Sequence, residues 1–215
     1  MVKIDKDKPL PDHTKLDYDE CCAKLILEEL FPERYTELTL ADKPDLQGDG
    51  VGIEVTIANN NKMEEARNNW VKANNCDNAV QKARYIERMA QLGVHYTGGV
   101  QGWPGFAPTF DLTRKAVESK IGKLKKGGYK SFPRYELFVF TDTWFCDSVI
   151  DAAKTFLFDE KVSRYFKTVY VLSQGADLHI FETQESQYKN EKIDTIEQSN
   201  RNRRARRMVE EGEED

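Results

Sequence analysis

The first regular feature of the chain is a helical repeat of apolar side chains near its N-terminus. In residues 17–30, apolar side chains occupy positions 21, 22, 25, 26 and 30, which form one stripe of an amphipathic helix. Asp17 or Asp19 can cap this helix. The next apolar segments, residues 35–40, 43–47 and 51–58, are short and separated by turn residues, and they predict a meander of three strands.

The middle of the chain predicts helices. Residues 59–92 are charged and helical in character, with a break at residues 74–78 and an end at Gly93, so we expect two helices there. Residues 95–110 contain too much glycine and proline for regular structure and predict a long loop. A further helix is expected from residue 111 to residue 126, where Gly127 and Gly128 stop it.

The last third of the chain returns to apolar strands. Residues 135–141 predict a strand buried in a sheet, residues 145–156 a helix, and residues 167–172 and 178–182 two final strands. From residue 187 onward the chain is polar, and we expect a helical or disordered tail. The alternation of strands and helices predicts an α/β fold with a mixed central sheet flanked by helices.

The length of 215 residues suits one domain. We therefore divide the sequence into a polar leader of residues 1–16, an α/β domain of residues 17–186, and a charged tail of residues 187–215. Within the α/β domain, residues 61–110 form a helical and loop insertion that follows the third strand.

Charge and cysteine content limit the binding partners and the cellular compartment that we expect. The net charge is −5, but residues 114–134 hold eight lysines or arginines against one acid, Glu118, so a local basic surface remains available to a polyanion. No stretch approaches the roughly 18 apolar residues of a membrane span, and no signal peptide opens the chain. Four cysteines without metal-ligand spacing are typical of a reducing compartment. We expect a cytoplasmic protein with no membrane partner.

Residues 42–58 contain the most informative pattern. Asp49-Gly50 is a favoured hairpin turn, and it pairs residues whose numbers sum to 99. One face of the hairpin is then largely apolar, with Leu46 opposite Ile53, Pro44 opposite Val55 and Gly48 opposite Val51.

The other face of this hairpin places Asp45 across from Glu54, and Lys43 across from Thr56. Two facing carboxylates destabilise a sheet unless a cation lies between them or one is protonated. A divalent ion with oxygen ligands, Mg²⁺ or Mn²⁺, would remove that cost. Such an ion could also activate water for hydrolysis of a phosphodiester. The alternative is that Asp45 is a turn residue and Glu54 an unrelated solvent-facing residue.

At this hairpin the chain resembles the PD-(D/E)xK, or restriction-endonuclease-like, nuclease superfamily. Pro44-Asp45 stands for the PD, and Glu54-Val55-Thr56 stands where (D/E)xK is expected. The resemblance covers residues 17–141 and implies an αβββαβ core and metal-dependent cleavage of nucleic acid that leaves a 5′-phosphate. It also implies a glutamate from the first helix in the metal shell, for which we choose Glu20, beside the Val55 carbonyl.

The chain departs from the motif at Thr56, which replaces the lysine. Two lysines could supply the missing charge. Lys120 lies within the apolar stripe of its helix, so its ammonium must reach an acid, a phosphate or the surface. Lys43 would lie beside Thr56 by the hairpin register.

The expected function is therefore that of a Mg²⁺-dependent DNA endonuclease with Asp45, Glu54, Lys120 and Lys43 as candidate catalytic residues. Its partner would be nucleic acid, and a homodimer would suit double-strand cutting. An alternative is an inactive nuclease-like fold that binds nucleic acid or protein. Another is an assembly protein of a phage or mobile element that uses its charged tail.

Overall fold

The computed structural model describes residues 10, 14–96, 100–101 and 108–212. Most of the predicted leader and part of the predicted loop at 95–110 lie outside these residues. The chain divides into two compact units. The larger contains His13–Ala58 and Pro108–Asp215, and the smaller contains Met1–Asp12 and Asn59–Ala107.

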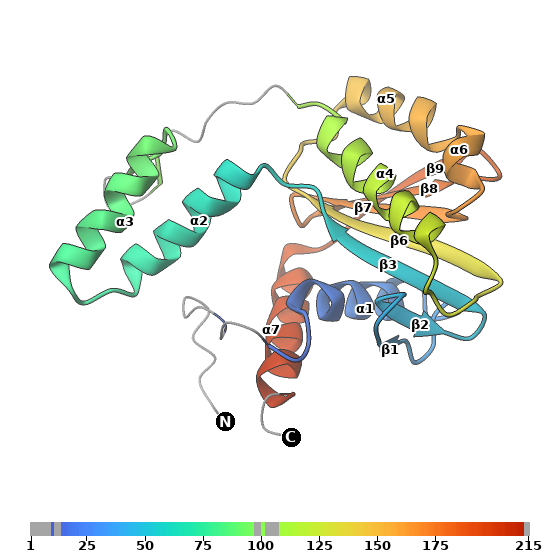
Figure 1. Cartoon of the computed structure of the whole chain (residues 1–215), viewed down its shortest axis with the longest axis horizontal. Helices are drawn as coiled ribbons and strands as arrows, with labels where there is room; N and C mark the ends of the chain where they lie inside the picture. Colours follow the sequence, from blue (N-terminus) through green and yellow to red (C-terminus); the bar gives the residue numbers. More distant parts are fainter. Residues whose placement is uncertain (1–9, 11–13, 97–99, 102–107, 213–215) are drawn as a thin grey trace. The chain divides into compact units, whose positions relative to one another are not determined.

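A mixed sheet forms the centre of the larger unit (Figure 1). Its seven strands among the described residues follow the order β1-β2-β3-β6-β7-β8-β9. β3, β6 and β7 run parallel, and every other neighbouring pair is antiparallel. The strands are β1 (Thr39–Leu40), β2 (Leu46–Gly48), β3 (Val51–Ile57), β6 (Arg134–Thr141), β7 (Thr168–Ser173), β8 (Asp177–Glu182) and β9 (Gln187–Lys192). The predicted α/β class with a mixed sheet is confirmed.

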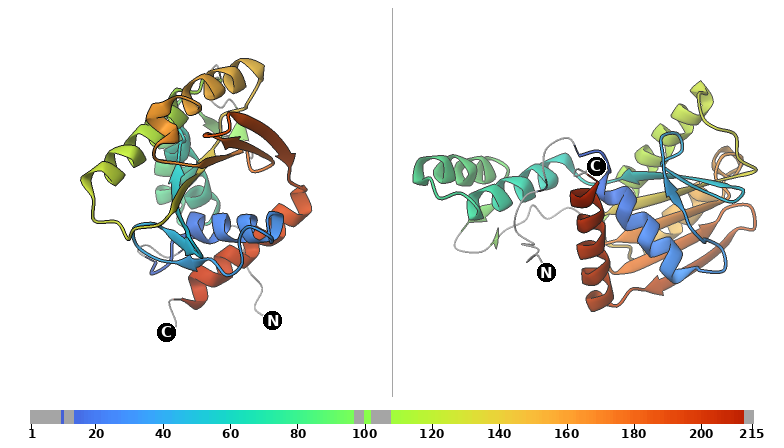
Figure 2. Two further views of the ribbon diagram at one scale, coloured as in Figure 1. Left: turned by 90° about the vertical axis from the view of Figure 1, so that its right-hand side faces the viewer. Right: turned by 90° about the horizontal axis from the view of Figure 1, so that it is seen from below.

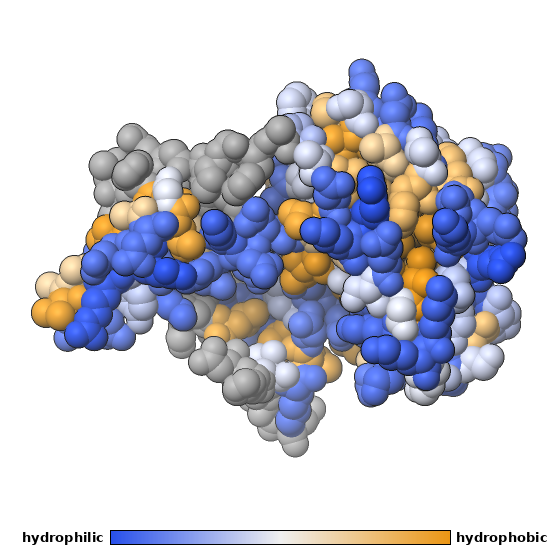
Figure 3. Space-filling view, turned by 45° about the horizontal axis from the view of Figure 1, so that its top comes forward, coloured by the Kyte–Doolittle hydropathy of each residue, from blue (hydrophilic) through white to orange (hydrophobic). Residues whose placement is uncertain are grey.

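Helices cover both faces of this sheet (Figures 1 and 2). On one face lies α1 (Tyr18–Leu30), capped by Asp17, one of the two predicted candidates, and α7 (Thr195–Glu211) packs against α1. The other face is covered by α4 (Asp111–Lys126), α5 (Asp147–Leu157) and α6 (Glu160–Ser163). Figure 3 shows hydrophilic residues around a band of hydrophobic ones on a face of this unit.

Alternation along the strands supplies the apolar side chains of both cores. On β3, Val51, Ile53 and Val55 enter the core under α1, while on β6 Leu137 and Val139 enter the core under α4 and α5. Because successive side chains of a strand point to opposite faces, the intervening residues of β3 face α4. This alternation directs Glu54 toward α4.

The smaller unit is a helical hairpin with a short two-stranded ladder. It contains α2 (Asn61–Asn74), α3 (Ala79–Gln91), β4 (His95–Tyr96) and β5 (Val100–Gln101). Its core is small and consists of Ala66, Met89 and Val94 with Trp70 and Leu92 packed against them. Arg88 also bonds Glu65 through two nitrogens and so links the two helices. Both helices were predicted, and the ladder lies where we expected only loop. In the part of the chain that the structure describes, no helix has the length and apolar character needed to cross a membrane.

Two sequence predictions were wrong in detail. The segment predicted as a strand from residue 35 begins as a turn, because the Arg34 and Tyr35 amides both donate to the Phe31 carbonyl and only Thr39–Leu40 joins the ladder. The predicted tail from residue 187 begins with β9, whose exposed polar side chains carry no apolar alternation. Backbone pairing with β8 holds this strand, and α7 then packs on α1.

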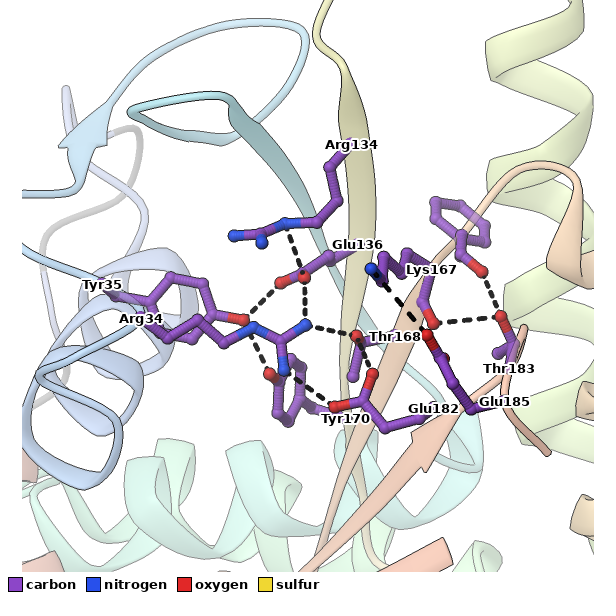
Figure 4. A network of polar contacts seen from close by, with 11 residues as sticks. Arg34, Tyr35, Arg134, Glu136, Lys167, Thr168, Tyr170, Glu182, Thr183 and Glu185 are labelled. Atoms are coloured by element: carbon purple, nitrogen blue, oxygen red, sulfur yellow. Dashed lines mark hydrogen bonds and ion pairs between the residues drawn. The ribbon is translucent and has the colours of Figure 1, made fainter. Parts of the chain in front are cut away.

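A buried ionic network lies on the α1 side of the sheet (Figure 4). Glu136 of β6 is fully buried, and its Oε1 lies 2.6 Å from Arg34 Nη2 and 3.1 Å from Arg134 Nε. Tyr35 donates its hydroxyl hydrogen to the other Glu136 oxygen. Arg34 also binds Glu182 at 2.8 Å, which ties the turn after α1 to β6 and β8.

Replacing Arg34 by Met should lower the free energy of unfolding by about 3 kcal/mol, because Glu136 would lose one of its two cationic partners while remaining buried. Urea unfolding of the variant and the parent protein measures this difference. The control is Arg164→Met, which removes an ion pair with Glu160 whose two side chains are 68% and 74% exposed. That change should have a much smaller effect, because water and salt screen an exposed ion pair. Equal losses in the two variants would contradict the role of Glu136.

Candidate functional site

The hairpin predicted around Asp49-Gly50 is present with the predicted register. Leu46 pairs with Ile53, Gln47 with Gly52 and Gly48 with Val51. Each pair of residue numbers sums to 99. The strand β2 begins at Leu46, so Asp45 lies immediately before the ladder and Glu54 lies within β3.

The chain bends away from the ladder before Asp45. Lys43 has a φ of 55°, and Pro44 lies over Gly52, where a Cβ atom would be 2.5 Å from the proline Cγ. The predicted pairing of Pro44 with Val55 is therefore wrong. Gly52 leaves room for this close approach because it has no side chain.

Asp45 nevertheless reaches β3 through its side chain. Its Oδ2 accepts a hydrogen bond from the Val55 amide at 2.7 Å, and its backbone carbonyl accepts from the Ala41 amide at 2.9 Å. These two bonds fix the carboxylate beside Glu54. Val55 thus contributes its N–H to the site, while the predicted role of its carbonyl stays a prediction.

Lys120 contacts both carboxylates from α4. Its Nζ lies 2.6 Å from Glu54 Oε2 and 3.0 Å from Asp45 Oδ2, and its side chain is 9% exposed. Lys120 shares the buried face of α4 with Val117 and Ile121, so the packing of the helix aims the ammonium at β3. Lys120, the one lysine within the apolar stripe of the helix, therefore has two acidic partners.

Lys43, the other candidate lysine, lies elsewhere. Its side chain is 57% exposed, and its ammonium lies 3.3 Å from the carboxylate of Asp42. The bend at Lys43 and Pro44 ends the register that would have placed this lysine beside Thr56. Of the two candidates, Lys120 is the one that contacts Asp45 and Glu54.

Glu20, chosen from the first helix, lies within the electrostatic field of the same groups. Burial, followed by the negative charge of Asp45, raises the pKa of Glu20 to about 8. Lys120 lowers this pKa and Glu54 raises it further. Glu20 therefore keeps its proton at neutral pH, while the carboxylates of Asp45 and Glu54 share the single ammonium of Lys120.

The buried pair also has shifted pKa values. Burial raises the pKa of Glu54, although the hydrogen bond from Lys120 opposes this shift. Burial lowers the pKa of Lys120, but the hydrogen bond and charge of Glu54 outweigh burial, so its pKa is raised overall. Lys120 therefore remains an ammonium at neutral pH.

One oxygen of Glu54 has an unmet bonding capacity. Glu54 is 1% exposed, and no described residue donates a hydrogen bond to its buried Oε1. Among the described residues, no three histidine, cysteine, aspartate or glutamate side chains are arranged to hold a metal ion. Mg²⁺, however, commonly uses one or two carboxylates and keeps several waters. Glu54 Oε1 and the excess negative charge fit such an ion.

Two residues near the carboxylates were not identified from the sequence. The Tyr129 hydroxyl donates to Glu54 Oε2 at 3.4 Å, and burial together with the charge of Glu54 raises the pKa of Tyr129 to about 12. Lys123 on the exposed side of α4 lowers the pKa of Glu54 through its charge. Both residues belong to the basic run of residues 114–134, in which spacing alone does not distinguish a site residue from a solvated one.

No family model, no curated protein and no solved structure matches this chain. A function for the chain must therefore come from its own residues.

Glu20 should make stability depend on pH. Its carboxyl pKa is about 8 in the folded protein against 4.5 for an ordinary glutamate. The folded state then binds the proton more tightly, so this contribution to stability is complete below pH 4.5, declines as pH rises, and is lost above about pH 8. Urea unfolding between pH 4.5 and 9 should show a steeper decline for the parent protein than for Glu20→Gln. The exposed Glu118→Gln is the control and should follow the parent, and parallel curves for all three proteins would contradict the prediction.

Proposed function

We propose that this protein hydrolyses phosphodiester bonds of nucleic acid, as a DNA endonuclease that depends on Mg²⁺ or Mn²⁺. The observation that carries the proposal is the meeting of Asp45, Glu54 and Lys120 at one point. Two of these residues come from a hairpin and its edge, and the third comes from a helix 66 positions after Glu54. Phosphodiester hydrolysis needs this combination of anionic ligands and a fixed cation.

The order of elements supports the same proposal. The larger unit runs through α1, the meander β1-β2-β3, α4 and β6, and β6 is parallel to β3. This order corresponds to the αβββαβ core that the resemblance to restriction-endonuclease-like proteins implies. The hairpin α2-α3 falls between β3 and α4, as an insertion would.

A divalent ion would be held by Asp45 and Glu54, with Glu20 and the Val55 carbonyl as further ligands. When bound, such an ion polarises the phosphate and lowers the pKa of water. Glu54 Oε1 is the oxygen most in need of a cation, because no described residue donates to it. Glu20 would give up its proton on binding, so metal affinity should increase as pH approaches 8.

Lys120 would serve the substrate as a charge and a hydrogen-bond donor. Its raised pKa excludes a role as a base at neutral pH. Its position between the two carboxylates would let the ammonium orient water or a phosphate oxygen at the same place where the motif lysine is expected. Attack of water on phosphorus with departure of O3′ would leave a 5′-phosphate and a 3′-hydroxyl.

Basic residues beside the carboxylates favour a polyanionic substrate. Lys123 is exposed on α4, and its charge reaches Glu54. Lys130 is also exposed, and its Nζ lies 3.2 Å from Gln47 Oε1 on the neighbouring strand β2. Such residues bind phosphates beside the scissile bond and make affinity depend on salt.

A binding module without catalysis is the second candidate. It is favoured by the two ion pairs of Lys120, which already compensate part of the negative charge of Asp45 and Glu54 without a metal. Such a protein would bind DNA with salt-dependent affinity and show no turnover with Mg²⁺ or Mn²⁺.

Incubation with single-stranded, double-stranded and branched DNA in Mg²⁺, Mn²⁺ or chelator tests the two candidates. We expect cleavage that needs the metal and that Glu54→Gln lowers by at least about 100-fold, because a neutral amide no longer binds the ion. Mn²⁺ should also raise the melting temperature of the parent protein more than that of Glu54→Gln. The control Glu118→Gln changes a surface glutamate of α4 and should cut like the parent. Salt-dependent DNA binding without any cleavage would favour the binding module.

Lys120→Met separates a catalytic lysine from a structural counter-ion. We expect cleavage to fall by about 100- to 1,000-fold, as when an enzyme loses one preorganised donor. The melting-temperature increase with Mn²⁺ should persist or grow, because the ion would then be the main compensation for Asp45 and Glu54. Near-parental cleavage by Lys120→Met would exclude the proposed role. Lys125→Met, which changes an exposed lysine on the same helix, is the matched control.

A further inference from the structure

The segment after α4 holds one aromatic residue against the carboxylates. Gly127 and Gly128 have φ values of 77° and 87°, and these left-handed conformations reverse the chain directly after the helix. Two bonds then anchor the segment. The Lys130 amide donates to the Lys43 carbonyl at 3.1 Å, and the Tyr135 hydroxyl donates to the Lys130 carbonyl at 2.5 Å. Tyr129 is thereby held beside Glu54.

The contact between Tyr129 and Glu54 is weak. Its length of 3.4 Å exceeds the 2.5–3.0 Å typical of a hydrogen bond between two oxygens. The same Glu54 oxygen already receives the Lys120 ammonium at 2.6 Å. Little is therefore lost if the Tyr129 hydroxyl turns to another acceptor, and its side chain is only partly buried.

The positive charges near Tyr129 favour a phosphate as that other acceptor. Lys130 follows it directly in the chain, and Lys123 of α4 acts on the same carboxylate as Tyr129 does. A phosphate that lies at Asp45 and Glu54 would thus meet the neutral hydroxyl of Tyr129 within the electrostatic field of the exposed Lys123. A tyrosine hydroxyl donates at neutral pH, since its ordinary pKa is about 10.

We propose that Tyr129 is a further catalytic residue, whose hydroxyl leaves Glu54 and donates to a non-bridging oxygen of the scissile phosphate. This inference rests on the proposed function. Negative charge grows on that oxygen when water attacks phosphorus, so the bond is stronger in the transition state than with bound substrate. The hydroxyl therefore acts on kcat more than on KM.

Initial cleavage rates against DNA concentration in Mn²⁺ test the proposal, with the DNA form that the parent protein cuts best. Tyr129→Phe should lower kcat by about 10- to 100-fold, as expected for loss of one hydrogen bond to a charged group, and change KM by less than about threefold. Tyr135→Phe is the matched control, because it removes a hydroxyl that anchors the same segment without contacting Glu54. It should keep kcat within about threefold of the parent value, because the bond from the Lys130 amide to the Lys43 carbonyl still anchors the segment. The increase of melting temperature with Mn²⁺ should be equal in all three proteins.

Three results would overturn the role of Tyr129 while leaving the endonuclease function in place. They are a parental kcat for Tyr129→Phe, an equal loss in Tyr135→Phe, and disappearance of the Mn²⁺ effect in Tyr129→Phe alone. The second result would assign the loss to order in the segment, and the third would assign the hydroxyl to the carboxylates. Failure of the parent protein itself to cut DNA with Mn²⁺ would end both proposals, and it is seen before any variant is compared.

Discussion

The contact on which this site depends is the one between the Lys120 ammonium and the carboxylates of Asp45 and Glu54. A glutamate that is 1% exposed pays a large desolvation cost, and a second carboxylate beside it adds repulsion. The ammonium at 2.6 Å and 3.0 Å offsets both. Because Lys120 belongs to α4 and the acids belong to the hairpin, the same contact also fixes how the helix lies on β3. The same three residues therefore determine both the charges of the site and the packing of α4 on the sheet.

Comparison of two buried glutamates on neighbouring strands shows why one of them suits a cation. Glu136 lies on β6 opposite Ile53, one register position from Glu54, and it faces α1. Two arginines and a tyrosine serve its oxygens, so it acts in the structure as a link between the turn after α1 and the sheet. Glu54 has one strong cationic partner, a long contact to Tyr129 and an oxygen that no described residue serves. The first glutamate is satisfied by the fold, while the second still has capacity for a ligand.

Sequence patterns predicted the parts of the site that follow local rules. The turn at Asp49-Gly50 and the alternation of β3 fixed the register, and the apolar stripe of α4 singled out Lys120 because a buried ammonium needs an acid. The bend at Lys43 and Pro44 could not be predicted, because it depends on the fit of Pro44 against Gly52. β9 carries no apolar alternation, and it is held by backbone bonds to β8 and by Tyr188, which packs against Phe181 and bonds His179. Tyr129 was missed because a tertiary bond between Lys130 and Lys43 positions its segment.

Position 56 of β3 and Lys120 of α4 both lie beside Glu54. Thr56 follows Glu54 by two residues and therefore shares its face of β3, which is where a lysine of the (D/E)xK pattern would project. That face is covered by α4, and Lys120 enters the same space from the helix. A strand lysine beside Lys120 would add a second ammonium at little distance and repel the first. The uncharged Thr56 avoids this repulsion and so is compatible with Lys120. With Lys120 in this position, Asp45 and Glu54 already have a cationic partner, and the uncharged Thr56 adds no second one.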